Sequence, residues 1–146
     1  MKNCLISIFL SGTVLFSLLS CSNKNNTVID VFTKFPDEIQ GCACYFARTK
    51  EDLYKGNYIF TDNHEDLGFI SINGTMVKLD LVSYNDVSEG KWIKVFTNKD
   101  YEIIINSEQI WQVDQIWHQK AVITIKDNKG NLVTESEHVF GECGGC

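Results

Sequence analysis

The fold is decided by the stretch Phe69-Ile70-Ser71-Ile72-Asn73-Gly74, which is followed closely by Val77-Lys78-Leu79-Asp80-Leu81. The second segment alternates apolar and polar residues, as a strand with one solvated face does. Asn-Gly is the strongest short signal of a hairpin, because both central residues of a type I′ turn need a positive φ. The stretch therefore predicts two antiparallel strands joined by a tight turn.

More hairpins are expected toward the C-terminus. The expected pairs are residues 91–97 with 101–105 around Asn98-Lys99-Asp100, and residues 121–126 with 132–139 around 127–131. Another short strand is expected over residues 57–61. Successive hairpins predict an antiparallel meander, and open sheet edges invite aggregation, so such a meander usually closes on itself or packs as two sheets. The sequence predicts an all-β fold, with a small β-barrel preferred and a β-sandwich as the alternative.

At most one short helix is expected. Thr49 is suited to cap its start, Asp52 follows three residues later, and Gly56 is suited to end it. Residues 107–117 stay ambiguous, because apolar residues recur at helical spacing in a segment that is rich in strand-forming residues.

The N-terminal segment has the features of an export signal. Lys2 precedes an apolar run from Leu5 to Leu19, which ends in Leu18-Leu19-Ser20-Cys21. A spanning helix needs about 20 apolar residues, and this run is shorter and interrupted by serine and glycine. The arrangement resembles the lipobox of bacterial lipoproteins. That resemblance implies cleavage before Cys21, lipidation of Cys21 and a membrane anchor.

The expected organisation follows from this resemblance. Residues 1–20 form a signal peptide, residues 21–27 the lipidated cysteine and a tether, and residues 28–146 a single β-domain. The Asn-, Lys- and Ile-rich composition is similar to that of Bacteroidota chains. In that phylum, surface-exported lipoproteins often carry acidic residues directly after the cysteine, and this chain has none before Asp30. The resemblance implies a membrane-anchored lipoprotein of the cell envelope that faces the periplasm.

The net charge and the motifs of the sequence disfavour several classes of function. The chain has 13 basic and 19 acidic residues, a formal net charge of −6, and no basic cluster interleaved with aromatic residues. An acidic surface disfavours nucleic acid as a partner. No sequence signature of a nucleophile elbow, a zinc protease, a phosphate-binding loop or a dinucleotide site is present. The sequence favours a non-enzymatic protein whose partners are the membrane, through lipid, and an envelope protein or a small ligand.

The six cysteines carry the most specific chemistry. Cys4 leaves with the signal peptide and Cys21 takes the lipid, which leaves four: Cys42, Cys44, Cys143 and Cys146. Three connectivities are open to four cysteines. In a closed meander the first and last strands are neighbours, so disulfides between the two ends of the domain are expected. Closing a loop of about 100 residues stabilises a fold by roughly 4.7 kcal/mol in the chain-entropy model.

A metal site is the alternative use of these cysteines. Four thiolates in two short motifs suit structural Zn or soft Cu(I), and His138, five residues before Cys143, is a further candidate ligand. Thiol exchange at the Cys143/Cys146 pair is a third possibility. Apart from Zn or Cu(I), no cofactor is predicted.

Other polar and aromatic residues are given ordinary structural roles. Residues 62–66, with three acids and a histidine, are expected to form a solvated turn, with a cation site as the alternative. His118 is expected to lie half-exposed on a strand, with a place in a pocket as the alternative. At least two of Trp92, Trp111 and Trp117 are expected in the core, with an aromatic binding patch as the alternative.

The leading hypothesis is a lipid-anchored β-domain that binds a ligand or partner protein. Its layout is similar to that of small periplasmic β-barrel lipoproteins, including lysozyme inhibitors and envelope-stress sensors. A metal-binding or metal-sensing lipoprotein is the second hypothesis.

Overall fold

The computed structural model describes residues 27–144, which contain nine strands and one short helix. The strands are β1 (Ile29–Asp30), β2 (Ala43–Ala47), β3 (Phe60–Asp62), β4 (Leu67–Ile72), β5 (Thr75–Ser88), β6 (Lys91–Thr97), β7 (Tyr101–Val113), β8 (Ile116–Asp127) and β9 (Glu137–Gly144), and the helix is α1 (Lys50–Lys55). Cys4, Cys21 and Cys146 lie outside the described residues. Over residues 27–144, no helix is long and apolar enough to cross a membrane.

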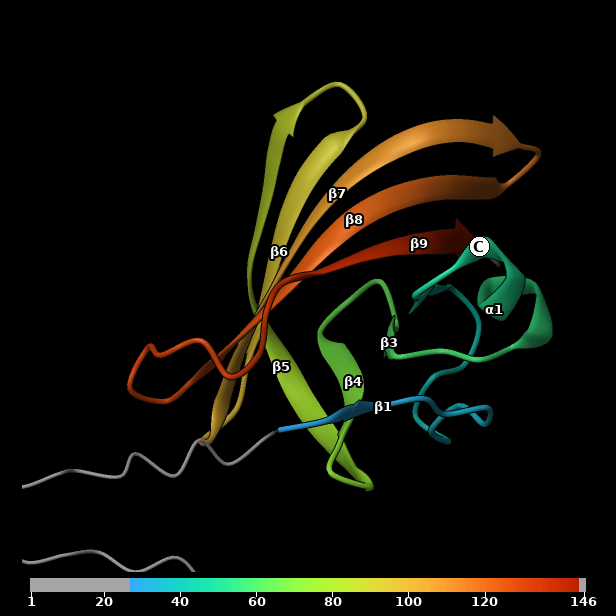
Figure 1. Cartoon of the computed structure of the whole chain (residues 1–146). Coiled ribbons are helices and arrows are strands. Elements are labelled where there is room, and N and C mark those ends of the chain that lie inside the picture. Colours follow the sequence, from blue (N-terminus) through green and yellow to red (C-terminus); the bar gives the residue numbers. More distant parts are fainter. Residues whose placement is uncertain (1–26, 145–146) are drawn as a thin grey trace, which may run out of the picture.

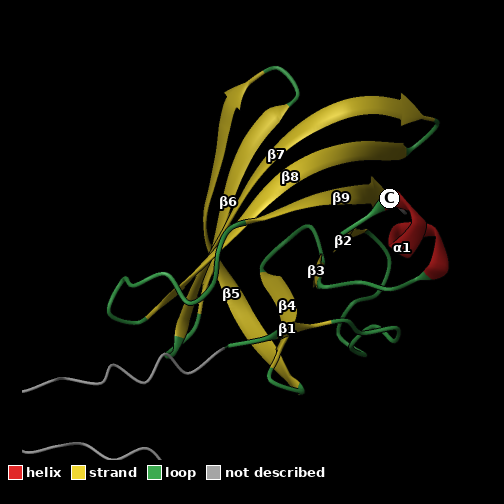
Figure 2. Cartoon of the chain, in the orientation of Figure 1, coloured by secondary structure: helices red, strands yellow, loops and turns green. Residues whose placement is uncertain are grey.

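The strands from β2 to β9 form one antiparallel meander that closes on itself. Each strand pairs with the next along the chain, and β9 pairs with β2, which completes an eight-stranded barrel. The two residues of β1 add to the edge of β4. Figures 1 and 2 show this single closed sheet with α1 at its side. The prediction of a small all-β barrel is confirmed.

The expected Asn-Gly hairpin is present. Asn73 and Gly74 both have positive φ, 50° and 74°, and Ile72 pairs with Thr75 across the turn. The hairpin around residues 98–100 is confirmed as β6 and β7, and the expected strand over residues 57–61 is confirmed in part as β3. The ambiguous segment 107–117 is not helical: it forms the end of β7, a turn at residues 114–115 and the start of β8.

One hairpin differs from expectation. Its second arm was placed at residues 132–139, but β9 begins only at Glu137. The preceding loop makes a single bridge, between Lys126 and Leu132. The backbone N–H of Val133 donates to the Ile125 carbonyl, at 2.9 Å, and the Val133 side chain packs against the core. This loop therefore packs Val133 against the core instead of extending the sheet, and its remainder projects to the side of the barrel (Figure 1).

The helix begins and ends at the expected residues. The Thr49 hydroxyl oxygen accepts a hydrogen bond from the Asp52 N–H at 3.0 Å, which satisfies a donor of the first helical turn. Gly56 ends α1 with a φ of 74°, a left-handed conformation that glycine adopts without steric cost.

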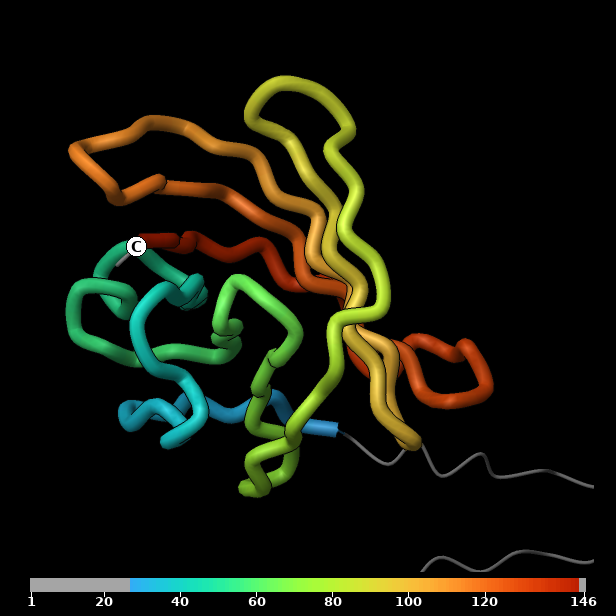
Figure 3. The backbone as a smooth tube through the Cα atoms, turned by 180° about the vertical axis from the view of Figure 1, so that it is seen from behind, coloured from blue at the N-terminus to red at the C-terminus, as the bar shows by residue number. Residues whose placement is uncertain are grey.

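The residues that face the barrel interior change from apolar to polar and aromatic along the barrel axis. In β6 the inward-facing residues run from Phe96 through Lys94 to Trp92. In β8 they run from Ile125, Ile123 and Ala121 through Gln119 to Trp117. The apolar end forms the core, whose largest buried side chains include three phenylalanines and several isoleucines. At the other end β5, β6, β7 and β8 form a long wall opposite the short strands β2, β3 and β4 (Figures 1 and 3).

Gly141 allows the seam between β2 and β9 to close. It lies directly opposite Phe46, whose ring occupies the space that a Cβ atom on Gly141 would need. We expect Gly141→Ala to destabilise the protein by about 1–3 kcal/mol through overpacking, measured by urea unfolding.

A Phe46→Leu background provides the control for this prediction. Leu at that position costs stability by itself, but it makes room beside residue 141. The cost of Gly141→Ala should therefore fall in the Phe46→Leu protein. An equal cost in both backgrounds would show that the contact with Phe46 is not the cause.

Candidate ligand-binding site

A cavity of about 430 Å³ opens at the end of the barrel where the long strands extend beyond the short ones. The opening of this cavity is called the mouth. It receives side chains from the β3–β4 turn and from five strands. The lining residues are His64, Glu65, Leu81, Tyr84, Trp92, Lys94, Gln109, Trp117, Gln119 and Cys143. Aromatic walls with a few polar groups at the base are typical of small-molecule sites in proteins.

An ion pair forms the base of this cavity. Lys94 Nζ donates to Asp62 Oδ1 at 2.9 Å, and the two side chains are only 5% and 2% exposed. Lys94 belongs to β6 and Asp62 to β3, which are not neighbours in the sheet, so the bond crosses the barrel interior. Burying either charge alone would be costly, and the pair places both beneath the cavity.

The disulfide Cys44–Cys143 lies beside this ion pair. The two residues are directly opposite each other on β2 and β9, with Cα atoms 4.0 Å apart. The expectation that the cysteines crosslink the two ends of the domain is confirmed for this pair. Cys42 is disulfide-bonded as well.

Of the proposed metal ligands, the structure brings Cys44 and Cys143 together, beside a histidine that was not among them. Nε2 of His64 and the sulfurs of Cys44 and Cys143 lie within 4.8 Å of one another. The two sulfurs are bonded to each other, so a metal would need them to be reduced first. His138 lies on the outer face of β9, whereas Cys143 faces inward, so the structure does not bring His138 to the two sulfurs.

His64 contacts both the disulfide and the ion pair. Its Nε2 lies 3.3 Å from Cys44 Sγ, and its backbone N–H donates to Asp62 Oδ1 at 2.9 Å. The φ of His64 is 65°, a left-handed conformation that Asn, Asp and His adopt more readily than other side chains. Burial, followed by the nearby Lys94 ammonium, lowers the pKa of His64, against an opposing effect of the Asp62 carboxylate.

Some buried side-chain oxygens have no partner within the protein. Among the described residues these are Asp62 Oδ2 in the ion pair, Gln119 Oε1 at the cavity, and Ser107 Oγ, which does not line the cavity. Buried polar atoms are almost always hydrogen-bonded in native proteins. Gln119 lines the cavity, so its buried oxygen is an unpaired acceptor at the cavity wall.

The positions of the three tryptophans differ from the prediction. Trp92 and Trp117 are only partly buried and line the cavity, while Trp111 is 48% exposed and stacks at 4.2 Å on His118. The prediction that at least two are core residues is wrong. The core is filled by smaller inward residues at the closed end, and the tryptophans lie above it, where the strands extend past the core.

The structure also shows where His118 and the turn at residues 62–66 lie. His118 lies on the outer face, where its Nδ1 is 3.1 Å from Glu142 Oε1, so it does not belong to the cavity. In the turn at residues 62–66, His64, Glu65 and Asp66 are exposed as expected, and His64 also lines the cavity, whereas Asp62 is buried and faces inward. Asp62 is still a strand residue, and the inward side of β3 determines its burial.

No family model, curated protein or solved structure matches this chain.

Sequence reasoning missed Lys94, Asp62 and Gln119. A signal for Lys94 and Gln119 exists, since each is a polar residue at an inward position of an alternating strand. An inward lysine needs a buried acid, and the turn at residues 62–66 offers three acids. Which of these three acids pairs with Lys94 depends on how the barrel closes, and this cannot be read from the sequence.

The ion pair leads to a stability prediction. Lys94→Met leaves the Asp62 carboxylate buried without a counter-charge and should cost about 3–5 kcal/mol in urea unfolding. The double variant Lys94→Met/Asp62→Asn removes both charges and should recover most of this loss. As a control, Lys91→Met breaks the exposed Lys91–Glu108 pair and should cost at most about 1 kcal/mol. Equal losses in the two lysine variants would contradict the role of Lys94.

His64 leads to a pH prediction. Its folded pKa lies below its ordinary value of 6.5, so the unfolded chain binds a proton more readily than the folded chain. The contribution of His64 to stability is complete above pH 6.5 and is lost as the pH falls toward the folded pKa. Urea unfolding between pH 7.5 and 5.5 should show less acid destabilisation in His64→Asn than in the wild type. The same dependence of the unfolding free energy on pH in both proteins, or a pKa of His64 above 6.5 measured by NMR, would contradict this prediction.

Proposed function

We propose that this protein is a non-enzymatic, lipid-anchored barrel of the cell envelope that binds a small amphipathic ligand in its mouth. The observation that carries this proposal is the cavity, which combines aromatic walls with a base of buried polar groups. A ligand with an apolar body and at least one hydrogen-bond donor matches both features.

The walls support binding of a flat or apolar group. Trp92 and Trp117 lie on different strands, β6 and β8, and Tyr84 adds a third ring from β5. Aromatic side chains offer large contact areas with little loss of conformational freedom.

The base supports recognition of a donor group. Gln119 Nε2 is already directed at Cys143 Sγ, which leaves Gln119 Oε1 as an acceptor. Lys94 is already paired with Asp62, so the cavity base has little net charge to offer an anion. An uncharged or amino-bearing ligand is therefore preferred over a carboxylate.

The cellular location rests on the N-terminal segment. The lipobox-like residues 18–21 support lipidation at Cys21 and a position in the envelope facing the periplasm. An oxidising compartment is consistent with the Cys44–Cys143 disulfide.

A metal-binding function is the second candidate. It is favoured by the close approach of Cys44 Sγ, Cys143 Sγ and His64 Nε2, a ligand set that suits Zn or Cu(I) once the disulfide is reduced. A native mass that includes a metal, with alkylatable cysteines after denaturation, would favour this candidate over the first.

The ligand-binding proposal can be tested with the uncharged dye N-phenyl-1-naphthylamine, whose amino group is a donor and whose rings suit the cavity walls. We expect one dye per folded protein in a fluorescence titration. Trp117→Ala should weaken the dye affinity by about tenfold, because an aromatic wall is lost.

Trp111→Ala is the matched control, since Trp111 lies outside this cavity. It should leave the dye affinity unchanged. No binding to the folded wild type, or equal weakening in both variants, would contradict the proposal.

A further inference from the structure

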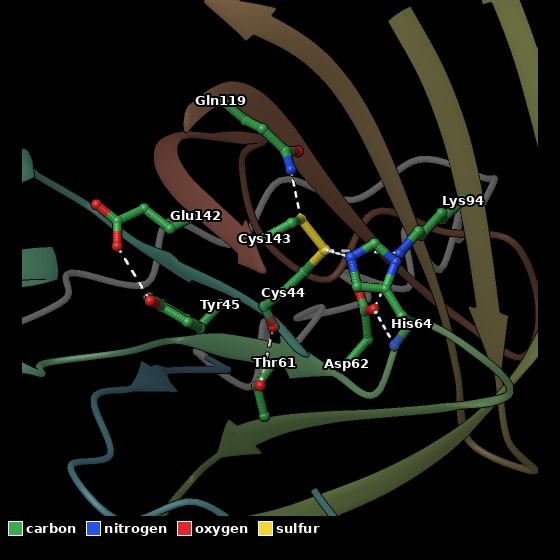
Figure 4. Close-up of a disulfide and its surroundings, with 9 residues drawn as sticks. All are labelled: Cys44, Tyr45, Thr61, Asp62, His64, Lys94, Gln119, Glu142 and Cys143. Carbon is green, nitrogen blue, oxygen red and sulfur yellow. Dashed lines mark hydrogen bonds and ion pairs between the residues drawn. A yellow bond between two sulfur atoms is a disulfide. The ribbon is translucent and has the colours of Figure 1, made fainter. Parts of the chain in front are cut away.

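The surroundings of the Cys44–Cys143 disulfide are polar, although both cysteines are buried. His64 Nε2 lies 3.3 Å from Cys44 Sγ, and Lys94 Nζ lies 3.8 Å from the same sulfur. Gln119 Nε2 contacts the other sulfur, Cys143 Sγ. Figure 4 shows His64 and Lys94 on one side of the disulfide and Gln119 on the other.

These nitrogen groups interact more strongly with a thiolate than with a disulfide. A disulfide sulfur is a weak, uncharged acceptor, whereas a thiolate receives charge-assisted hydrogen bonds. Neighbouring Lys and His side chains stabilise the thiolate form of cysteine. A disulfide whose reduced form is stabilised in this way is a stronger oxidant than a purely structural crosslink.

The cavity borders one of the two cysteines. Cys143 is among the residues that line it, and Cys44 is not, although both are only 1% exposed. A small molecule in the cavity is therefore nearer to Cys143, while His64 and Lys94 contact Cys44.

We propose that the Cys44–Cys143 disulfide exchanges with a small organic thiol that enters the cavity. This inference rests on the proposed ligand site, and it names a thiol as the class of ligand that reacts there.

The exchange has two balanced steps. The thiolate of the small molecule attacks Cys143 Sγ, a mixed disulfide forms, the Cys143–Cys44 bond breaks, and its electron pair leaves on Cys44 Sγ. That thiolate lies beside the Lys94 ammonium and the His64 imidazole. A second thiolate then attacks the sulfur of the bound small molecule and releases the symmetrical disulfide and the Cys143 thiolate. Two small thiols are oxidised, and one protein disulfide is reduced.

The barrel has other contacts that hold it closed after this reaction. Five residue pairs join β2 and β9 along the seam, and the Lys94–Asp62 pair crosses the interior independently of the sulfurs. The reduced barrel therefore keeps these contacts and is expected to stay closed.

The test uses the purified oxidised protein and cysteamine, a small thiol with an amino group, as the probe. Samples are quenched with acid, alkylated and digested, and fragmentation assigns each modified cysteine, because Cys42 and Cys44 share one tryptic peptide. We expect opening of Cys44–Cys143 at a rate proportional to cysteamine concentration, and faster than unfolding measured by tryptophan fluorescence. The trapped cysteamine adduct should be on Cys143.

His64→Asn is the informative variant, because Asn also adopts a positive φ and the residue lies in a turn. Loss of the imidazole should slow exchange by about tenfold, the factor that corresponds to ~1.4 kcal/mol. His138→Asn, on the outer face of β9, is the matched control and should exchange at the wild-type rate.

Three results would overturn the inference: opening limited by the rate of unfolding, an adduct mainly on Cys44, or equal rates in His64→Asn and His138→Asn. Dye binding is measured on the same samples. If the dye binds and the disulfide fails to exchange, the ligand site stands and the thiol inference falls. If the dye also fails to bind, both fall.

Discussion

The hydrogen-bonded ion pair between Lys94 and Asp62 is the constraint on which the rest of the site depends. It joins two strands that are not neighbours, so it is formed only when the barrel has closed. Asp62 Oδ1 also accepts from the backbone of His64, which fixes the β3–β4 turn and directs the imidazole at the sulfur of Cys44. Burying two charges carries a large desolvation penalty, even when they are paired. In this barrel the pair lies at the level where the apolar core ends.

The cavity is a consequence of strand length and of inward composition together. β5, β7 and β8 are 14, 13 and 12 residues long, whereas β3 has three. The long strands therefore continue beyond the level at which the short strands can supply packing partners. Above the ion pair the inward residues are tryptophan, glutamine and histidine, which cannot pack as densely as the isoleucines and phenylalanines below. Closure of the sheet thus produces a core at one end and an open site at the other.

The parts of this structure that local chemistry decides could be predicted from the sequence. The Asn73-Gly74 turn and the caps of α1 follow from backbone preferences of single residues. The crosslinked seam followed from a topological rule, because a closed meander makes its first and last strands neighbours. The Lys94–Asp62 contact could not be predicted in this way, since residues 32 positions apart meet only through the curvature of the whole sheet. The tryptophans were misplaced because hydrophobicity alone does not tell a core from a cavity wall.

The position of β1 determines where the N-terminal segment joins the barrel. Val28 exchanges hydrogen bonds with Asn73 at the β4–β5 turn, which lies at the closed end of the barrel. A chain held by its N-terminal side is therefore held at the end opposite the cavity. An anchor on that side would leave the entrance of the cavity as the part of the barrel that is not tied down.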